Sequence, residues 1–181
     1  MSRAKSVLNT LSAAEKGELL DELLAARPDL QELAEACAAQ RMSAEDSSAV
    51  ADDVEWALCG LDIDELNGRA GHRPGVGYVH PAEAADEILD EALQPFLDDL
   101  ARRSELGMAP AAVELAVGIL RGLYACRDGE PESLLEYSPD YATERGSDVV
   151  DRSGKLGIDL SIAELLDLMP AWSTILRPRR A

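Results

Sequence analysis

Apolar residues recur at helical spacing along most of this chain. The clearest stretch runs from Ala85 to Leu100, where apolar side chains stand three or four residues apart and acidic side chains fill the gaps. This spacing puts the apolar side chains on one face of an α-helix, whereas a half-buried strand alternates with a period of two. No strand-like alternation of comparable length occurs, and aromatic residues make up only 4% of the sequence. The sequence therefore predicts an all-α protein.

Local signals mark where the helices begin and end. Ser12 and Glu15 have the spacing of a capping box, and Ser161 and Glu164 repeat it near the C-terminus. Pro95 falls inside the clearest helical pattern, where it either kinks one helix or begins another. These signals predict seven or eight helices in antiparallel hairpins, forming a bundle or a short degenerate solenoid of the TPR or HEAT kind.

The stretch from Pro110 to Arg127 is apolar on nearly all sides. A helix of this kind is surrounded by other helices, so we expect it to be the central element. Gly118 and Gly122 stand four residues apart and permit a close helix crossing. We expect one α-helical domain over residues 1–181.

The formal net charge of −18 limits the partners of the chain. Binding to a nucleic-acid backbone requires clustered Lys and Arg, and binding to an anionic membrane has the same requirement. We therefore expect neither partner, although a mimic of nucleic-acid charge is an alternative. The acidic residues are interpreted as solvated helix faces, including the i, i+4 pairs Asp86/Asp90 and Glu87/Glu91.

Cys37, Cys59 and Cys126 are odd in number, widely separated and free of any CxxC pairing. This pattern favours reduced, mostly buried thiols in a cytoplasmic protein. No signal-peptide-like run opens the chain. Cys59, together with two histidines, offers metal-ligand chemistry, but these residues lie further apart than structural zinc ligands usually do. We expect no metal and no cofactor.

A glycine-rich loop over residues 67–81, NGRAGHRPGVGYVHP, holds four glycines and no acidic residue. One interpretation is an extended connection whose arginines pair with neighbouring carboxylates. Others are a protein-recognition loop or an anion site built from backbone N–H groups and arginines. The candidate ligand- or partner-binding residues are Arg69, His72, Arg73, Tyr78 and His80. His80 can instead cap the helix that begins at Pro81.

Two segments carry a family resemblance. The opening LSAAEKGELLDELLAARPDLQELAE, and the middle segment from GYVHPAEAADEILDEAL through AVELAVGILRGL, resemble the α-helical regions that accompany SWIM-type zinc fingers in bacterial proteins. The resemblance covers roughly residues 10–127. It implies a helical-repeat, partner-binding module without catalytic residues. The cysteine-histidine cluster of the zinc finger itself is absent from this sequence.

The C-terminal tail, residues 172–181, is apolar and then basic. It docks on a partner or on a second subunit, or it packs on its own domain. No catalytic motif such as GxSxG occurs. We therefore expect a non-enzymatic adaptor or scaffold that binds another protein, a peptide or a second copy of itself. The alternative is a small anionic-ligand binder or an enzyme with its site at residues 67–81.

Overall fold

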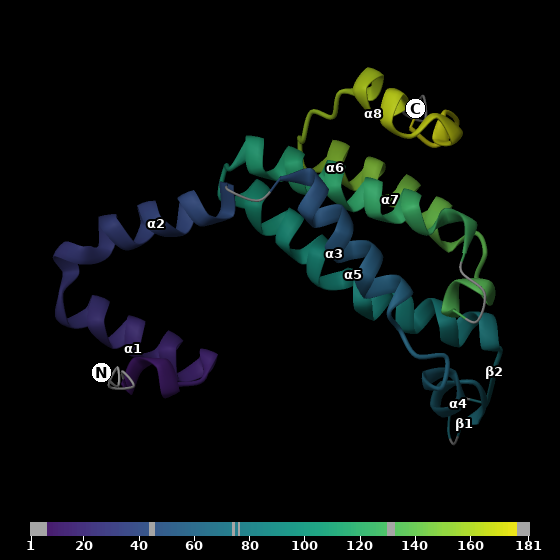
Figure 1. Ribbon diagram of the computed structural model, residues 1–181, viewed down its shortest axis with the longest axis horizontal. Coiled ribbons are helices and arrows are strands. Elements are labelled where there is room, and N and C mark those ends of the chain that lie inside the picture. Colours follow the sequence, from purple (N-terminus) through teal and green to yellow (C-terminus); the bar gives the residue numbers. More distant parts are fainter. Residues whose placement is uncertain (1–6, 44–45, 74, 76, 130–132, 177–181) are drawn as a thin grey trace, which may run out of the picture. The chain divides into compact units, whose positions relative to one another are not determined.

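The computed structural model describes residues 7–43, 46–73, 75, 77–129 and 133–176. Figure 1 shows helices joined by loops, with one small hairpin, among the described residues, which confirms the prediction of an all-α protein. By its contacts the chain separates into two compact units, Met1–Met42 and Ser43–Ala181. Each unit is described by itself below.

The N-terminal unit consists of two α-helices and two short 3₁₀ turns. Its elements are η1 (Val7–Thr10), α1 (Ala13–Ala26), η2 (Pro28–Leu30) and α2 (Gln31–Ser43). The capping box predicted for α1 is confirmed, since the Glu15 N–H donates to Ser12 Oγ at 3.3 Å and the Ser12 N–H donates to the Glu15 carboxylate at 2.8 Å. No residue of these four elements is buried.

The second unit is built on four α-helices. They are α3 (Ser47–Cys59), α5 (Pro81–Glu105), α6 (Ala109–Ala125) and α7 (Tyr141–Lys155). Contacts between matching positions of two helices show whether those helices run parallel or antiparallel. Ser47 and Cys59 of α3 meet Glu114 and Cys126, so α3 and α6 run parallel. Contacts of the same kind show that α5 and α7 also run parallel. The short turn at Gly107 reverses the direction of the chain between α5 and α6. The four helices therefore alternate in direction along the chain, as in an up-down-up-down bundle.

Helix α6 is the central element, as predicted, since it packs against α3, α5 and α7. Its tightest contact is with the parallel helix α3. A Cβ placed on Gly118 would lie 2.5 Å from Val50 Cβ, and one on Gly122 would lie 2.6 Å from Val54 Cβ. The two glycines are therefore required for the close crossing. Within the described residues, one segment, Ala109–Asp128, is long and apolar enough to span a membrane, but here it is the mostly buried core helix.

The structure adds three details, at Pro95, at the start of α3 and at Ser161. Helix α5 continues through Pro95 without a break. Helix α3 begins after Asp46, whose carboxylate accepts from the Ser48 and Ala49 N–H groups. The second capping box is wrong in its bonding, because Ser161 precedes α8 (Ile162–Leu168) but its side chain makes no capping hydrogen bond.

The glycine-rich loop contains a two-stranded antiparallel sheet that the sequence did not predict. Strand β1 (Gly71–Arg73) pairs with β2 (Gly77–Val79) directly after the short helix α4 (Glu65–Arg69). Each strand has only three residues, which is too short for period-two alternation to show in the sequence. The hairpin is a small local element within an all-α fold.

The described part of the C-terminal tail packs on its own unit. Trp172 is 4% exposed, and its ring meets the Tyr124 ring edge-on with centroids 5.2 Å apart. A Cβ on Gly146 of α7 would lie 2.7 Å from the Trp172 ring, so that glycine makes room for the indole. Leu176 is fully buried. The basic residues 177–181 lie outside the described residues.

Candidate functional site

The hairpin places two candidate residues on one exposed surface. His72 on β1 stands opposite Tyr78 on β2, and their rings meet edge-on with centroids 5.9 Å apart. Tyr78 is 65% exposed, whereas the next residue, Val79, is buried. Alternation along the strand therefore turns Val79 into the core and leaves the His72–Tyr78 pair at the surface.

The two candidate arginines lie along helix α5. Arg69 donates to both oxygens of Glu91, at 2.6 and 2.7 Å, and Arg73 Nη1 donates to Glu87 at 3.4 Å. The hydrogen bond from Arg69 holds the pKa of the Glu91 carboxyl below its ordinary value. The glutamates are four residues apart, as are the arginines, so the segment from α4 into β1 lies antiparallel to α5. The arginines thus attach the hairpin to the bundle.

The two arginines differ in how fully their donors are used. Both terminal nitrogens of Arg69 donate to Glu91. Arg73 Nε and Nη2 are shielded from solvent and, among the described residues, have no hydrogen-bond acceptor. Arg73 therefore retains donors for an additional acceptor, whereas Arg69 is committed to its ion pair.

His80 serves the helix that follows. Its Nδ1 accepts from the Ala82 N–H at 3.2 Å, which caps the N-terminus of α5. The helix-capping interpretation of His80 is therefore confirmed. Of the five candidate residues, the structure pairs His72 with Tyr78, aligns Arg69 and Arg73 along α5, and places His80 at the helix end.

The acidic pairs on α5 are largely exposed, as predicted, but they also bind other segments of the chain. Glu87 and Glu91 hold the hairpin, and the second pair, Asp86 and Asp90, holds the region of α7. Asp86 accepts a hydrogen bond from Ser138, and Asp90 accepts from Tyr141 and twice from Arg145. The three bonds to Asp90 measure 3.0 Å from the tyrosine and 2.7 and 2.8 Å from the guanidinium. Helix α5 is thus the support to which two other segments are bound.

Tyr141 is buried, unlike the carboxylate that accepts its hydrogen bond. Burial, followed by the negative charge of Asp90 and the hydrogen bond to it, raises the pKa of Tyr141 above its ordinary value. The tyrosine is therefore a neutral hydrogen-bond donor rather than an acid at neutral pH.

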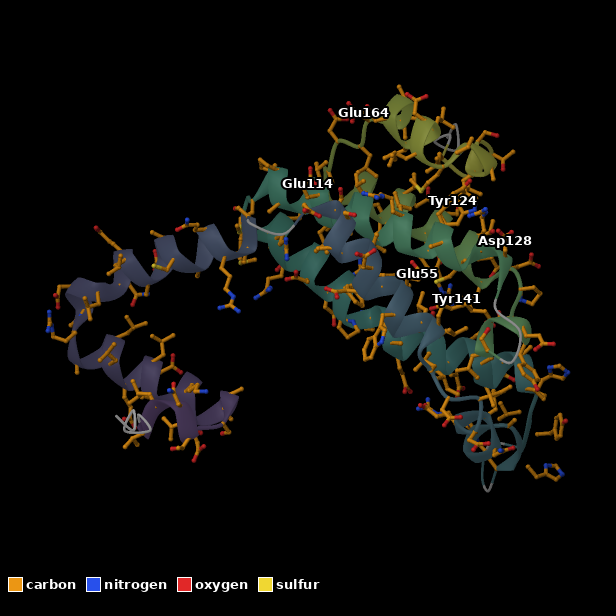
Figure 2. All side chains as sticks on the ribbon, viewed as in Figure 1. Glu55, Glu114, Tyr124, Asp128, Tyr141 and Glu164 are labelled. Carbon is orange, nitrogen blue, oxygen red and sulfur yellow. The ribbon has the colours of Figure 1, made fainter. Side chains whose placement is uncertain are left out.

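A depression of about 250 Å³ lies beside this cluster, between α5 and α7, and Asp90, Arg145 and Asp148 line it together with apolar side chains. Figure 2 labels Tyr141 among the side chains.

A second surface lies on the N-terminal unit, where sequence reasoning placed no site. Leu19, Leu20 and Leu23 of α1 are 38%, 49% and 48% exposed. We call these three residues the α1 leucine face. At 100° per residue they lie on one side of the helix, where Glu15 and Glu22 border them, and Glu18 and Asp21 lie on the opposite side. The helical spacing of these leucines was visible in the sequence, but their exposure was not.

The three cysteines are distributed differently from the prediction of mostly buried thiols. Cys37 is exposed, Cys59 is half-buried and Cys126 is buried. The Sγ atoms of Cys59 and Cys126 lie 3.3 Å apart, although the two residues are far apart in sequence. Within the described residues, no group of three or more His, Cys, Asp or Glu side chains gathers as metal ligands would.

The chain was compared with known proteins once this geometry was established. No protein-family model matches it, and neither a curated protein nor a solved structure matches it. The resemblance to SWIM-associated helical regions therefore stays a prediction.

Proposed function

We propose that this chain is a non-enzymatic protein-interaction module that binds a basic, amphipathic helical segment of another protein on its α1 leucine face. The observation that carries the proposal is the exposure of that face. The N-terminal unit has helices comparable in length to those of the bundle, yet no residue of its described helices and turns is buried.

The helices of the N-terminal unit have little stability of their own. Helix α1 has 14 residues and α2 has 13. Isolated helices of this length are marginal in water, and most helices in proteins gain their stability from packing an apolar face. Covering one of these half-exposed leucine side chains contributes roughly 1 kcal/mol, about half of the value for full burial. A partner that covers the leucine face therefore supplies the stabilisation that the unit lacks.

Charge selects the kind of partner. Helix α1 carries four carboxylates and one lysine, Lys16. The chain as a whole has a formal charge of −18, so a second copy brings like charge to the same surface. An apolar helix bordered by Lys or Arg satisfies both the leucines and the carboxylates, as helix-in-groove recognition requires.

A synthetic helical peptide of Leu and Lys at i, i+3 and i+4 spacing is a suitable probe, with binding measured by titration calorimetry at two salt concentrations. Leu19→Gln/Leu23→Gln should weaken binding by about tenfold or more, because both anchors are lost. Leu168→Gln is the matched control, since Leu168 is 51% exposed but lies in the bundle unit. It should bind as the wild type does.

The same experiment can contradict the proposal. Binding that is unchanged by the α1 substitutions would mean that the peptide is held by charge alone. Equal loss of affinity in the Leu168→Gln control would mean that the peptide does not bind specifically at α1. A dimer in sedimentation velocity that dissociates on Leu19→Gln/Leu23→Gln would show that a second copy occupies the face. Each of these outcomes overturns the basic-helix assignment.

A second candidate function is the binding of a small anion at Arg73. It is favoured by the two shielded donors of Arg73, Nε and Nη2, for which the described residues offer no acceptor. Titration with inorganic phosphate should then shift the amide resonances of the hairpin, and Arg73→Gln should abolish the shifts. Arg69→Gln serves as the comparison, because Arg69 is already paired with Glu91. Absence of phosphate-dependent shifts in the wild type would exclude this function.

A further inference from the structure

Two cysteines meet where helices α3 and α6 end. Cys59 is the last residue of α3, and Cys126 directly follows α6. Their Sγ atoms are 3.3 Å apart, whereas the sulfurs of a disulfide lie about 2.05 Å apart. Closing the remaining distance requires the two sulfurs to approach each other by about 1.3 Å.

The helix packing holds this pair together. Val50 lies against Gly118, Val54 lies against Gly122, and the cysteines continue the same register one step further along the parallel helices. Both glycine contacts are too close to admit a Cβ. Because interiors are packed with few voids, the two helices have little freedom to separate at the cysteine end. The folded structure therefore presents the two sulfurs to each other.

The two cysteines differ in access. Cys59 is half-buried and lines an open, shallow depression together with Asp52, Glu55, Trp56 and Gly60. Cys126 is only 4% exposed. A small oxidant therefore reaches Cys59 first, and Cys126 lies behind it in position to attack the oxidised sulfur.

We propose that Cys59 and Cys126 form a reversible intramolecular disulfide when the protein meets a hydroperoxide. In the first step the Cys59 sulfur takes one oxygen from the hydroperoxide, giving a sulfenic acid and releasing an alcohol, or water when the oxidant is hydrogen peroxide. In the second step the Cys126 sulfur attacks the Cys59 sulfur and hydroxide leaves, which takes up the thiol proton as water. Two equivalents of a small thiol reverse the reaction.

This bond would link the ends of two core helices across a sequence separation of 67 residues. Cross-links that close long loops restrict the unfolded chain most, so oxidation should raise the melting temperature, by roughly 5–15 °C for a unit of this size. Both cysteines lie in the bundle unit, whereas the α1 leucine face belongs to the N-terminal unit.

The full chain carrying Cys37→Ser tests the proposal without interference from the exposed third thiol. The reduced, folded protein is treated with hydrogen peroxide, and its thiols are counted before non-reducing peptide mapping. We expect both remaining thiols to be lost, a linked Cys59–Cys126 peptide to appear, and the melting temperature to rise. Dithiothreitol should restore the two thiols and the original melting temperature.

Cys37→Ser/Cys59→Ala is the control, and circular dichroism confirms that it folds. It should show no linked peptide and no rise in melting temperature, and its Cys126 should stay reduced at the same peroxide dose. Three results would overturn the proposal. They are oxidation of Cys59 to sulfinic acid without a link, a link that forms only in denaturant, and a link that leaves the melting temperature unchanged.

Discussion

The two units of this chain use the same residue types with opposite results. Leu89 and Leu123 in the bundle are fully buried, whereas Leu20 and Leu23 in α1 are about half exposed, at 49% and 48%. Both sets of leucines stand at helical spacing. Helical periodicity therefore specifies which face is apolar but not what covers it. The bundle supplies that cover internally, whereas the leucines of α1 stay exposed.

The largest expected effect is the difference in lost stability between replacing a buried leucine and replacing an exposed one. Leu123→Ala should reduce the free energy of unfolding of the bundle by about 2–5 kcal/mol, because it removes buried methyl groups and leaves a cavity. Leu23→Ala should change it by less than about 0.5 kcal/mol, as surface substitutions usually do. Urea denaturation followed by circular dichroism measures both. A loss at Leu23 equal to that at Leu123 would mean that α1 belongs to the cooperative core.

Glycine substitutions should also affect the two units differently, destabilising the bundle and stabilising α1. Gly122→Val should destabilise the bundle by about 1–3 kcal/mol, because its side chain would collide with Val54 and the Ala51 carbonyl. Gly17 of α1 has nothing within 4 Å of an added Cβ. Gly17→Ala should therefore stabilise α1 by about 0.5–1 kcal/mol through helix propensity. Thermal melts test the first substitution, and hydrogen exchange of the α1 amides tests the second. A Gly122→Val variant as stable as the wild type would contradict the close crossing.

Ion pairs in the two units should also differ in how much they stabilise the protein. Asp99 accepts from the buried Arg103 at 2.8 Å and also from Arg102. Burial on its own raises the pKa of Asp99, but the hydrogen bonds from both arginines outweigh it and leave the pKa below its ordinary value of 3.8. Asp99→Asn should therefore cost about 1–2 kcal/mol at pH 7. Asp29→Asn in the N-terminal unit should cause no measurable loss, because the Arg27–Asp29 pair is exposed on both sides.

The sign of the pH dependence follows from the lowered pKa of Asp99. Since the unfolded chain takes up the proton at higher pH than the folded chain, the pair stabilises the fold fully above about pH 4. That contribution is lost as the pH falls through the folded-state pKa. Urea denaturation from pH 7 to pH 2 should show the difference between wild type and Asp99→Asn shrinking only at the acid end. A constant difference would contradict this account.

The smallest expected effect concerns the two capping sequences. Ser12→Ala should destabilise α1 by about 1 kcal/mol, because both hydrogen bonds of its capping box are formed. Ser161→Ala should have little effect on α8, since the Ser161 side chain makes no capping bond. Amide exchange rates in the first turns of the two helices measure the difference. Equal protection losses would show that the two caps are equivalent in solution.

The sequence predicted the helices well where the signal was local. The start of α1 at Ser12, the central place of α6 and the close crossing at Gly118 and Gly122 all follow from neighbouring residues. The hairpin was missed because three-residue strands have no readable period. For the candidate site, the capping by His80 agrees with one predicted interpretation, whereas the binding role of Tyr78 stays a prediction.

Other features of the site lay beyond sequence reasoning because they join distant segments. The sequence suggested that the loop arginines pair with neighbouring carboxylates, but not that α5 supplies those carboxylates or that it also accepts hydrogen bonds from the region of α7. The cysteine pair was hidden for the same reason, since 67 residues separate its members. Spacing within one helix carries no information about which other segment will come to lie against it.

Periodicity, capping residues and composition were enough to determine an acidic, all-α chain, because helix formation depends on side chains three and four residues apart. Only the tertiary structure decided which leucines are covered, which carboxylates bind arginines and which thiols meet. Those outcomes depend on the direction and register in which helices pack, and these are set by contacts between residues far apart in the chain.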